Sequence, residues 1–458
     1  MMQTEQCQNS KTGSATSAEK RGISLPAAVS LVITSMIGVG VFTSVGFQLL
    51  GLPSAFPILL LWVVGGVVSL CGALCYAELV AMIPRSGGEY HLLREAYHPL
   101  VGFLAGWISM TAGFAAPISS ISMVFGKYLH SLGMPFASKL MAGGLILIIA
   151  AVYLGNLRLG GRFLTATTSL KVTLILAFLA GAVFLSQGQS ASLAPKAGDA
   201  VLVASPSFAN SLVYVMFAYL GWNGAAYVAG EVKNPQRTVP LAFILGIVIV
   251  MALYVALNAV FLWRAPWAEM QGKEEAGLIA AKAIFGGTGG WWMGALIAFG
   301  TVSTVAGFTL AGSRVSQRIG QDFAGVGFLG RVNRFGAPWV AVLVQTVIAL
   351  LILFSGTFDQ VTNYMMSQLT LCSMLAVLAV IVMRWRLPRA ERPFRVPLYP
   401  LPALIFLGMS SWMLVFWVRA RPAESALGLL TLVVGTVFYL LITATSNLRS
   451  GRGLCARD

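Results

Sequence analysis

Twelve apolar runs, each long enough to cross a lipid bilayer as a helix, follow one another along the chain. A helix rises about 1.5 Å per residue, so about 20 apolar residues span the hydrocarbon core. Because 57% of the residues are hydrophobic and only 10% are charged, a soluble fold could not cover so much apolar surface. The sequence therefore predicts an all-α polytopic membrane protein with 12 transmembrane helices. The expected helices are 24–50, 57–81, 99–126, 140–157, 164–186, 207–230, 240–263, 291–313, 338–355, 361–383, 399–418 and 425–444.

The basic residues are distributed unevenly between the connecting segments. With a cytoplasmic N-terminus, 21 of the 30 lysines and arginines lie in inside segments and 8 in outside segments, while Lys171 lies within a helix. This division predicts cytoplasmic termini and an even number of helices, and it explains the net charge of +15 without a nucleic acid partner. Residues 1–22 lack the apolar core of a signal peptide and are expected to be a disordered cytoplasmic tail, with a second tail at 447–458.

Two of the predicted helices carry glycine at their centre, where a helix is weakened. The first contains Ile37-Gly-Val-Gly-Val41, and the sixth contains Phe217-Ala-Tyr-Leu-Gly-Trp-Asn223. They occupy matching places in two blocks of five helices, 23–203 and 204–385, which leaves helices 11 and 12 in 386–446. Because five is odd, the second block enters the membrane from the opposite side, and the two blocks form an inverted repeat. Paired interrupted helices of this kind are typical of a transporter's substrate site.

A helix broken inside the membrane exposes backbone polar groups, which are tolerated only where protein or a polar cavity covers them. A half-helix that starts there points free N–H groups into the cavity, and one that ends there presents free carbonyls. A zwitterionic amino acid needs both, as donors for its carboxylate and as acceptors for its ammonium. The alternative is that each glycine only allows two helices to pack closely.

Three motifs extend these observations: IGVGVF at 37–42, YAELVAMIPRSGGEYHLLREAYHP at 76–99 and FAYLGWNGAAYVAGEVKNPQRTVP at 217–240. With them the chain resembles the amino acid–polyamine–organocation (APC) transporters, and within these the L-type-like amino acid transporters. The resemblance covers about residues 22–445. It implies a LeuT-like fold, with a 5+5 inverted repeat in which helices 1 and 6 are broken, and amino acid transport by alternating access.

The resemblance also assigns roles to residues at both breaks. The N–H groups of Val39 and Gly40 would hold the substrate carboxylate, and Phe217 would close over the substrate as the outer gate. Val39 stands where serine or alanine is common, so a hydroxyl contact is lost while the N–H remains. Leu220 stands where some relatives have Asp or Gly, which leaves the preferred side chain open. The carbonyls of Met36, Phe217, Ala218 and Leu220 would hold the ammonium, and Trp222 and Asn223 would border the side-chain pocket. The full substrate-binding set is Met36, Ile37, Gly38, Val39, Gly40, Phe217, Ala218, Leu220, Trp222 and Asn223.

Lys171 lies about seven residues into the fifth predicted helix, roughly 10 Å from its start. A charge at that depth indicates function, and the resemblance implies an ammonium that packs against the broken first helix in place of a sodium ion. Carrying a coupled proton is a second role, and reaching the inner headgroups with its long stem is the structural alternative. Ser303 and Thr304 lie near where relatives supply sodium-site hydroxyls, and ordinary helix packing would explain them equally well.

Other chemistries find little support in the sequence. No P-loop, metal-ligand spacing or nucleophile–base set is visible, so we expect neither an enzyme nor a cofactor. The outer loop 128–136 contains no cysteine, whereas in animal L-type transporters this loop carries the disulfide to a heavy subunit. We therefore expect no disulfide-linked subunit, and a prokaryotic inner membrane as the location. Glu78 and Glu231 are expected to anchor inner-loop arginines or helix ends.

The sequence as a whole predicts a sodium-independent secondary active transporter of amino acids, which works by exchange or by proton coupling. Its partners would be the amino acid substrate and the lipid bilayer. Neutral amino acids are favoured because no acidic residue is evident in the pocket to hold a cationic side chain. Cationic amino acids or polyamines are the alternative. A sensor that binds amino acids without carrying them is the alternative from another class, and it would be expected to have a large cytoplasmic domain.

Overall fold

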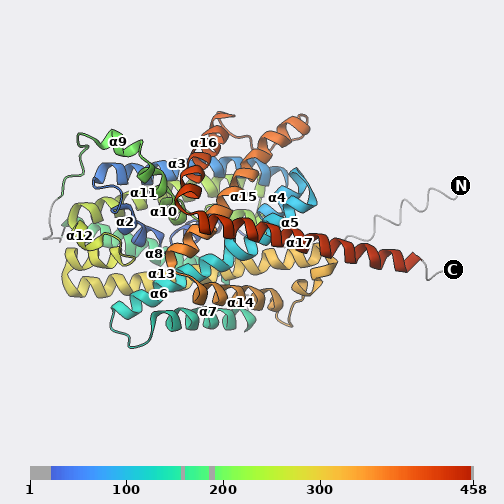
Figure 1. Ribbon diagram of the computed structural model, residues 1–458, viewed down its shortest axis with the longest axis horizontal. Coiled ribbons are helices and arrows are strands. Elements are labelled where there is room, and N and C mark those ends of the chain that lie inside the picture. The colour runs from blue at the N-terminus through green and yellow to red at the C-terminus, as the bar shows by residue number, and fades with distance from the viewer. Residues whose placement is uncertain (1–21, 156–159, 185–190, 455–458) are drawn as a thin grey trace.

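The computed structural model describes residues 22–155, 160–184 and 191–454, which are almost wholly helical (Figure 1). One isolated β-bridge joins Ile23 to Val232. In chain order the elements are α1 (Leu25–Met36), α2 (Gly40–Gln48), α3 (Ala55–Met82), α4 (Glu89–Ala96), α5 (Pro99–Ile108), the π-helix η1 (Ser109–Ala115), α6 (Ala116–Ser131), α7 (Ser138–Gly155), α8 (Gly160–Phe184), α9 (Asp199–Val203), α10 (Pro206–Ala218), the 3-10 helix η3 (Gly224–Glu231), α11 (Pro235–Arg264), α12 (Trp267–Met270), α13 (Ala276–Asp322), the 3-10 helix η4 (Ala324–Gly330), α14 (Trp339–Ser355), α15 (Phe358–Arg386), α16 (Leu401–Ala420) and α17 (Pro422–Leu454).

Eight helical segments within the described residues are long and apolar enough to cross a membrane. Three shorter apolar helices, α7, α8 and α14, lie in the ranges predicted for the fourth, fifth and ninth spans. The interrupted segment from α10 to η3 lies in the range predicted for the sixth. The protein is therefore a helical, multi-pass membrane protein, while the total of twelve spans stays a prediction.

The eighth predicted helix, 291–313, lies within α13, which consists of two helices joined at a kink. α13 begins at Ala276 and turns at Gly286, where φ is 74° and ψ is −166°. No atom lies within 4 Å of the position that a Cβ would take there, so the positive φ alone favours glycine. The residues before this kink form a separate short helix that contains Lys282, which the charge count assigns to an outside segment, and the kink divides it from the helix that carries the apolar run.

Three buried aromatic side chains fix the core where α3 and α11 lie side by side. Trp62 of α3 packs against Tyr219 and Tyr254, with ring centroids 6.3 and 5.4 Å away. The Tyr219 hydroxyl donates to the Trp62 carbonyl at 2.9 Å. Tyr219 directly follows α10, so this cluster holds α11 against the point where the sixth predicted helix is interrupted.

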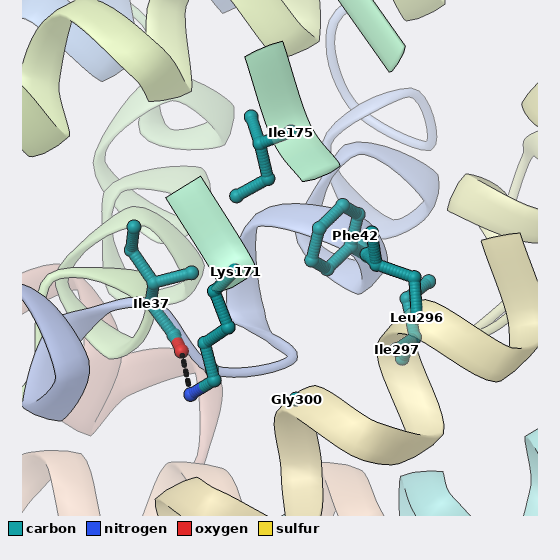
Figure 2. A pocket seen from close by; sticks show the side chains of 8 residues that line it. Ile37, Phe42, Lys171, Ile175, Leu296, Ile297 and Gly300 are labelled. Atoms are coloured by element: carbon teal, nitrogen blue, oxygen red, sulfur yellow. Dashed lines mark hydrogen bonds between the residues drawn. The ribbon is translucent and has the colours of Figure 1, made fainter. Parts of the chain in front are cut away.

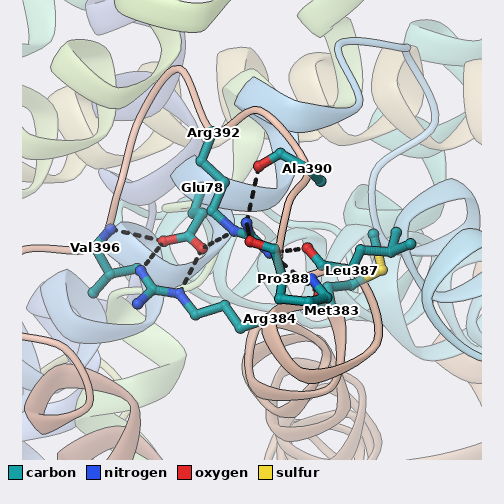
Figure 3. A network of polar contacts seen from close by, with 8 residues as sticks. All are labelled: Glu78, Met383, Arg384, Leu387, Pro388, Ala390, Arg392 and Val396. Carbon is teal, nitrogen blue, oxygen red and sulfur yellow. Dashed lines mark hydrogen bonds and ion pairs between the residues drawn. The ribbon is translucent and has the colours of Figure 1, made fainter.

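Glu78, near the end of α3, is a buried carboxylate that ties α3 to the end of α15 and to the loop after it (Figure 3). Arg384 donates two hydrogen bonds to it, at 2.8 and 2.5 Å, and the Val396 N–H donates a third at 2.8 Å. Arg392 lies 3.4 Å away as a second cation. A buried carboxylate requires such partners because an unpaired charge in a protein interior is costly. The predicted contact of Glu78 with inner-loop arginines is confirmed.

Candidate functional site

The first break separates α1, which ends at Met36, from α2, which begins at Gly40. Ile37 leaves the helical conformation, with φ −73° and ψ 85°, and the Gly38 N–H donates to the Met36 carbonyl at 2.8 Å. The N–H groups of Val39 and Gly40 meet no acceptor among the described residues, as expected for the first turn of a helix. The start of α2 therefore offers two free donors and the positive end of a helix dipole, which together suit a carboxylate.

The second break begins where α10 ends at Ala218, and the chain then continues as the 3-10 helix that starts at Gly224. Gly221, between them, has φ 97°. A Cβ on Gly221 would lie 2.5 Å from the Ser35 carbonyl oxygen, so both backbone conformation and space require glycine. The Leu220 carbonyl accepts no hydrogen bond from the part of the chain that the structure describes, and it is therefore a free acceptor at this break.

The two breaks contact each other. A Cβ on Gly40 would lie 2.5 Å from the Cα of Ala218. The Tyr254 hydroxyl of α11 lies 2.6 Å from the Met36 carbonyl and 2.9 Å from the Ala218 carbonyl. The Phe217 carbonyl accepts a backbone N–H at 3.1 Å. Three of the four carbonyls predicted for the substrate ammonium thus already have a donor, although each oxygen has two lone pairs and can take a second.

Lys171 of α8 is buried, and its ammonium lies at the first break (Figure 2). It donates to the Ile37 carbonyl at 3.0 Å and to the Thr304 hydroxyl at 2.9 Å. The side chain therefore does not extend to the headgroups. Ser303 donates to the Gly300 carbonyl at 3.0 Å, within its own helix. The structure brings Lys171 and Thr304 together and leaves Ser303 apart from them.

Two cavities border the breaks. The space beside the Lys171 ammonium is only about 10 Å³, too small for an amino acid. A second cavity of about 1290 Å³ reaches Leu220, Trp222, Asn223 and Thr304 from the predicted substrate and sodium-like sets, but not the other predicted residues. Its remaining walls include the loop after α3, the helix α4 and the end of α13, with Arg85, Glu95, Arg318 and Asp322 among them.

Phe217, the predicted outer gate, lies outside this large cavity. It is buried and packs edge-on against Phe358 of α15, with ring centroids 5.7 Å apart. Next to it, Phe47 of α2 stacks on Tyr214 of α10 at 4.9 Å. Tyr214 also donates to Asp359 at 2.7 Å. These aromatic rings and the Tyr214–Asp359 hydrogen bond therefore cover the breaks on the side away from α4. The large cavity lies on the side of α4.

Among the acidic residues of this cavity that sequence reasoning missed, Glu89 at the start of α4 is the one that contacts the second break. It is 3% exposed and accepts hydrogen bonds from Asn223 at 2.5 Å and from Tyr227 at 2.7 Å. Burial raises the pKa of its carboxyl above the ordinary value. The signal in the sequence was the glycine pair before it in the second motif, Gly87 and Gly88, which both adopt positive φ, 131° and 56°.

The chain was also compared with known proteins. The family model for amino acid permease matches residues 23–442. The chain belongs to the amino acid permease family. This permease is 28% identical to the b(0,+)-type amino acid transporter 1 of Mus musculus over 439 residues, 93% of this chain and 88% of that protein. It is equally similar, at 28%, to the Asc-type amino acid transporter 1 of Mus musculus (93% and 81% covered) and to the cystine/glutamate transporter of Homo sapiens (92% and 85% covered).

These findings confirm the resemblance to the L-type-like transporters of the APC superfamily. The family and the relatives of the permease are transporters and not enzymes, and their function supports amino acid transport. The helices described above make it an integral, multi-pass membrane protein.

Proposed function

We propose that this permease is a sodium-independent secondary active transporter that carries neutral amino acids by alternating access. The observation that carries the proposal is the contact of the Lys171 ammonium with the Ile37 carbonyl, beside Thr304. A covalently attached cation at the break supplies the positive charge that a bound sodium ion would otherwise supply. It would also repel a sodium ion placed beside it.

In this proposal the substrate lies between the two breaks. Its carboxylate accepts from the free N–H groups of Val39 and Gly40, and its ammonium donates to the free carbonyl of Leu220 and shares the Met36 and Ala218 carbonyls with Tyr254. Phe217 acts as the outer gate. Its packing against Phe358, on the side away from the large cavity, supports a conformation closed on that side and open on the other.

The side-chain pocket supports neutral substrates. Leu220 and Trp222 present apolar surface to the cavity, and Asn223 is a neutral hydrogen-bonding group. Cationic amino acids or polyamines are the alternative, and Glu89 is the observation that favours them, because it places a carboxylate in the cavity wall. That carboxylate, however, already takes hydrogen bonds from Asn223 and Tyr227, so it is engaged by the protein itself.

The proposal includes the remaining predicted organisation. We propose twelve helices in a LeuT-like 5+5 repeat (23–203 and 204–385, followed by 386–446), with both termini cytoplasmic, in a prokaryotic inner membrane. In Figure 1, α4 lies toward one end of the molecule and α9 and α12 toward the other, which supports the inner and outer loops assigned from charge. We also propose that no disulfide-linked subunit is needed. Of the five cysteines, three lie in the described residues, and all are buried: Cys71, Cys75 and Cys372.

Uptake into proteoliposomes of the purified permease tests this function. A mixture of radiolabelled amino acids is supplied with and without sodium, with and without a pH gradient, and with and without unlabelled amino acid inside. We expect saturable, sodium-independent uptake of neutral amino acids. A requirement for internal amino acid identifies an exchanger, and uptake into empty vesicles driven by an inward proton gradient identifies a symporter. Binding without uptake under every condition would refute transport and favour a sensor.

A further inference from the structure

Glu89 contacts the second break directly. One of its carboxylate oxygens accepts from the Asn223 amide at 2.5 Å and from the Tyr76 hydroxyl at 3.2 Å, and the other accepts from the Tyr227 hydroxyl at 2.7 Å. Tyr76 belongs to α3, Asn223 ends the break and Tyr227 lies in η3. A single carboxylate on α4 therefore joins α3 to the end of the second break and to η3.

The carboxylate of Glu89 has no ion-pair partner among the described residues. Within its own helix, Arg94 pairs with Asp322 at 2.9 Å instead, while Glu95 is exposed and His91 is partly buried. α5, which also packs against α4, carries no titratable side chain. The titratable groups that face Glu89 from other elements are Tyr76 of α3, Tyr227 of η3 and Cys372 of α15.

The Asn223 side chain binds both Glu89 and Tyr227, at 2.5 and 3.2 Å. Asn223 is the residue next to Trp222, whose ring packs on Tyr76 at 4.7 Å. These five side chains therefore hold the end of the break on the wall of the large cavity. Nothing else in α4 reaches the break by a hydrogen bond among the described residues.

We propose that Glu89 is a positioning residue for transport: through Asn223 and Tyr227 it sets the course of the second break, and with it the places of the Leu220 carbonyl and the Trp222 ring at the substrate cavity. This inference rests on the proposed function, because it concerns the substrate site of that transport. Glu89 acts through these neighbours and needs no contact with the substrate.

Protonation of Glu89 is expected to change the substrate KM in one direction. Since burial raises its pKa, the buried arrangement is favoured when the carboxyl is protonated and is weakened as the pH rises through that pKa. In the neutral form one oxygen still accepts from Asn223, and the other, now an O–H, donates to the Tyr227 hydroxyl. The substitution Glu89→Gln keeps this pattern at every pH, because its amide offers one acceptor and a donor group.

The test measures exchange of the radiolabelled amino acid that the wild type exchanges fastest, with the same pH on both sides of the vesicle, between about pH 5 and pH 9. We expect the wild-type KM to rise several-fold toward high pH. Glu89→Gln should keep the low-pH KM throughout. Glu391→Gln is the control, because it removes an exposed carboxylate that does not line the large cavity, and it should follow the wild type.

Two results would overturn the proposal: a wild-type pH profile retained in Glu89→Gln, or a wild-type KM that does not change with pH. If Glu89→Gln does not fold, Tyr227→Phe is the deciding variant, since it keeps the Glu89 carboxylate and removes the two hydrogen bonds of the Tyr227 hydroxyl, to Glu89 and from Asn223. Tyr227→Phe should raise the KM at all pH values, and an unchanged KM would contradict the positioning role. Absence of any exchange by the wild type would instead refute the transport function, and the same variants would then be compared by amino acid binding.

Discussion

The two breaks of this permease differ in how the chain resumes and in what supports it. After the first break the chain resumes as an α-helix, and the support is a cation, Lys171, on the Ile37 carbonyl. After the second break, where Gly221 has positive φ, the chain resumes as a 3-10 helix. The support there is an acidic residue, Glu89, which accepts hydrogen bonds from Asn223 of the break and Tyr227 of η3. The two glycine-containing stretches are therefore similar in sequence, but the residues that stabilise them carry opposite kinds of side chain, a lysine at the first break and a glutamate at the second.

The difference follows from which backbone groups each break leaves exposed. At Ile37 a carbonyl turns away from its helix, so an ammonium donor satisfies it. At the second break the Asn223 and Tyr227 side chains point donors at one place, so an acceptor satisfies them. The comparison predicts that variants at the two breaks will fail in different ways.

The largest effect is expected from Gly221→Ala. Its φ of 97° strains any other residue, and the added Cβ would overlap the Ser35 carbonyl, which is backbone and cannot rotate away. We expect exchange to fall by roughly 100-fold, which corresponds to about 3 kcal/mol, measured as initial rate per folded protein. Gly336→Ala is the control, because Gly336 also has positive φ but has open space around it. Equal losses in both variants would show that general strain, and not the contact between the breaks, is responsible.

Lys171→Met should have the second-largest effect. It removes two hydrogen bonds from a buried ammonium and leaves the Ile37 carbonyl without that donor. A hydrogen bond to a charged group contributes about 1.5–3 kcal/mol, and we expect exchange to fall by the equivalent of one such bond, roughly 10- to 100-fold. The control is Lys233→Met, an exposed lysine outside both breaks. Exchange at the wild-type rate in Lys171→Met would remove the main support for sodium independence through Lys171.

Tyr254→Phe is expected to have a moderate effect on the substrate KM. Its hydroxyl holds the Met36 and Ala218 carbonyls together across the two breaks, and losing a buried hydrogen bond costs about 1 kcal/mol, or roughly 5-fold. Tyr219→Phe is the matched control, since Tyr219 is equally buried but donates to the Trp62 carbonyl. A similar KM change in both variants would assign the effect to the aromatic core instead.

The smallest effects on exchange are expected from removing the neighbouring hydroxyls of Thr304 and Ser303. Thr304→Ala removes a contact of the Lys171 ammonium and should lower exchange a few-fold. Ser303→Ala removes only a bond to the Gly300 carbonyl of its own helix, and should stay within a factor of about 2 of the wild type. The opposite order would mean that Ser303 and not Thr304 supports the first break.

The membrane class, the ranges of most helices and the positions of both interruptions were predictable from the sequence. Long apolar runs can be satisfied only by helices in lipid, and a central glycine weakens a helix wherever it occurs. The contact of Lys171 with the first break was available through the resemblance, since periodicity alone does not show what a side chain meets. The short helix before the kink at Gly286 was missed because it lies before the apolar run that predicted the eighth helix.

By itself, the sequence determined the class of the protein and where its helices break, because hydropathy and glycine act locally. Only the tertiary structure decided what supports each break. Tyr254 reaches both breaks from α11, and Glu89 reaches the second from α4, more than 100 residues away in the chain. Such pairings depend on how distant helices pack, and a carboxylate buried among neutral donors looks in sequence like any charged residue of an inner loop.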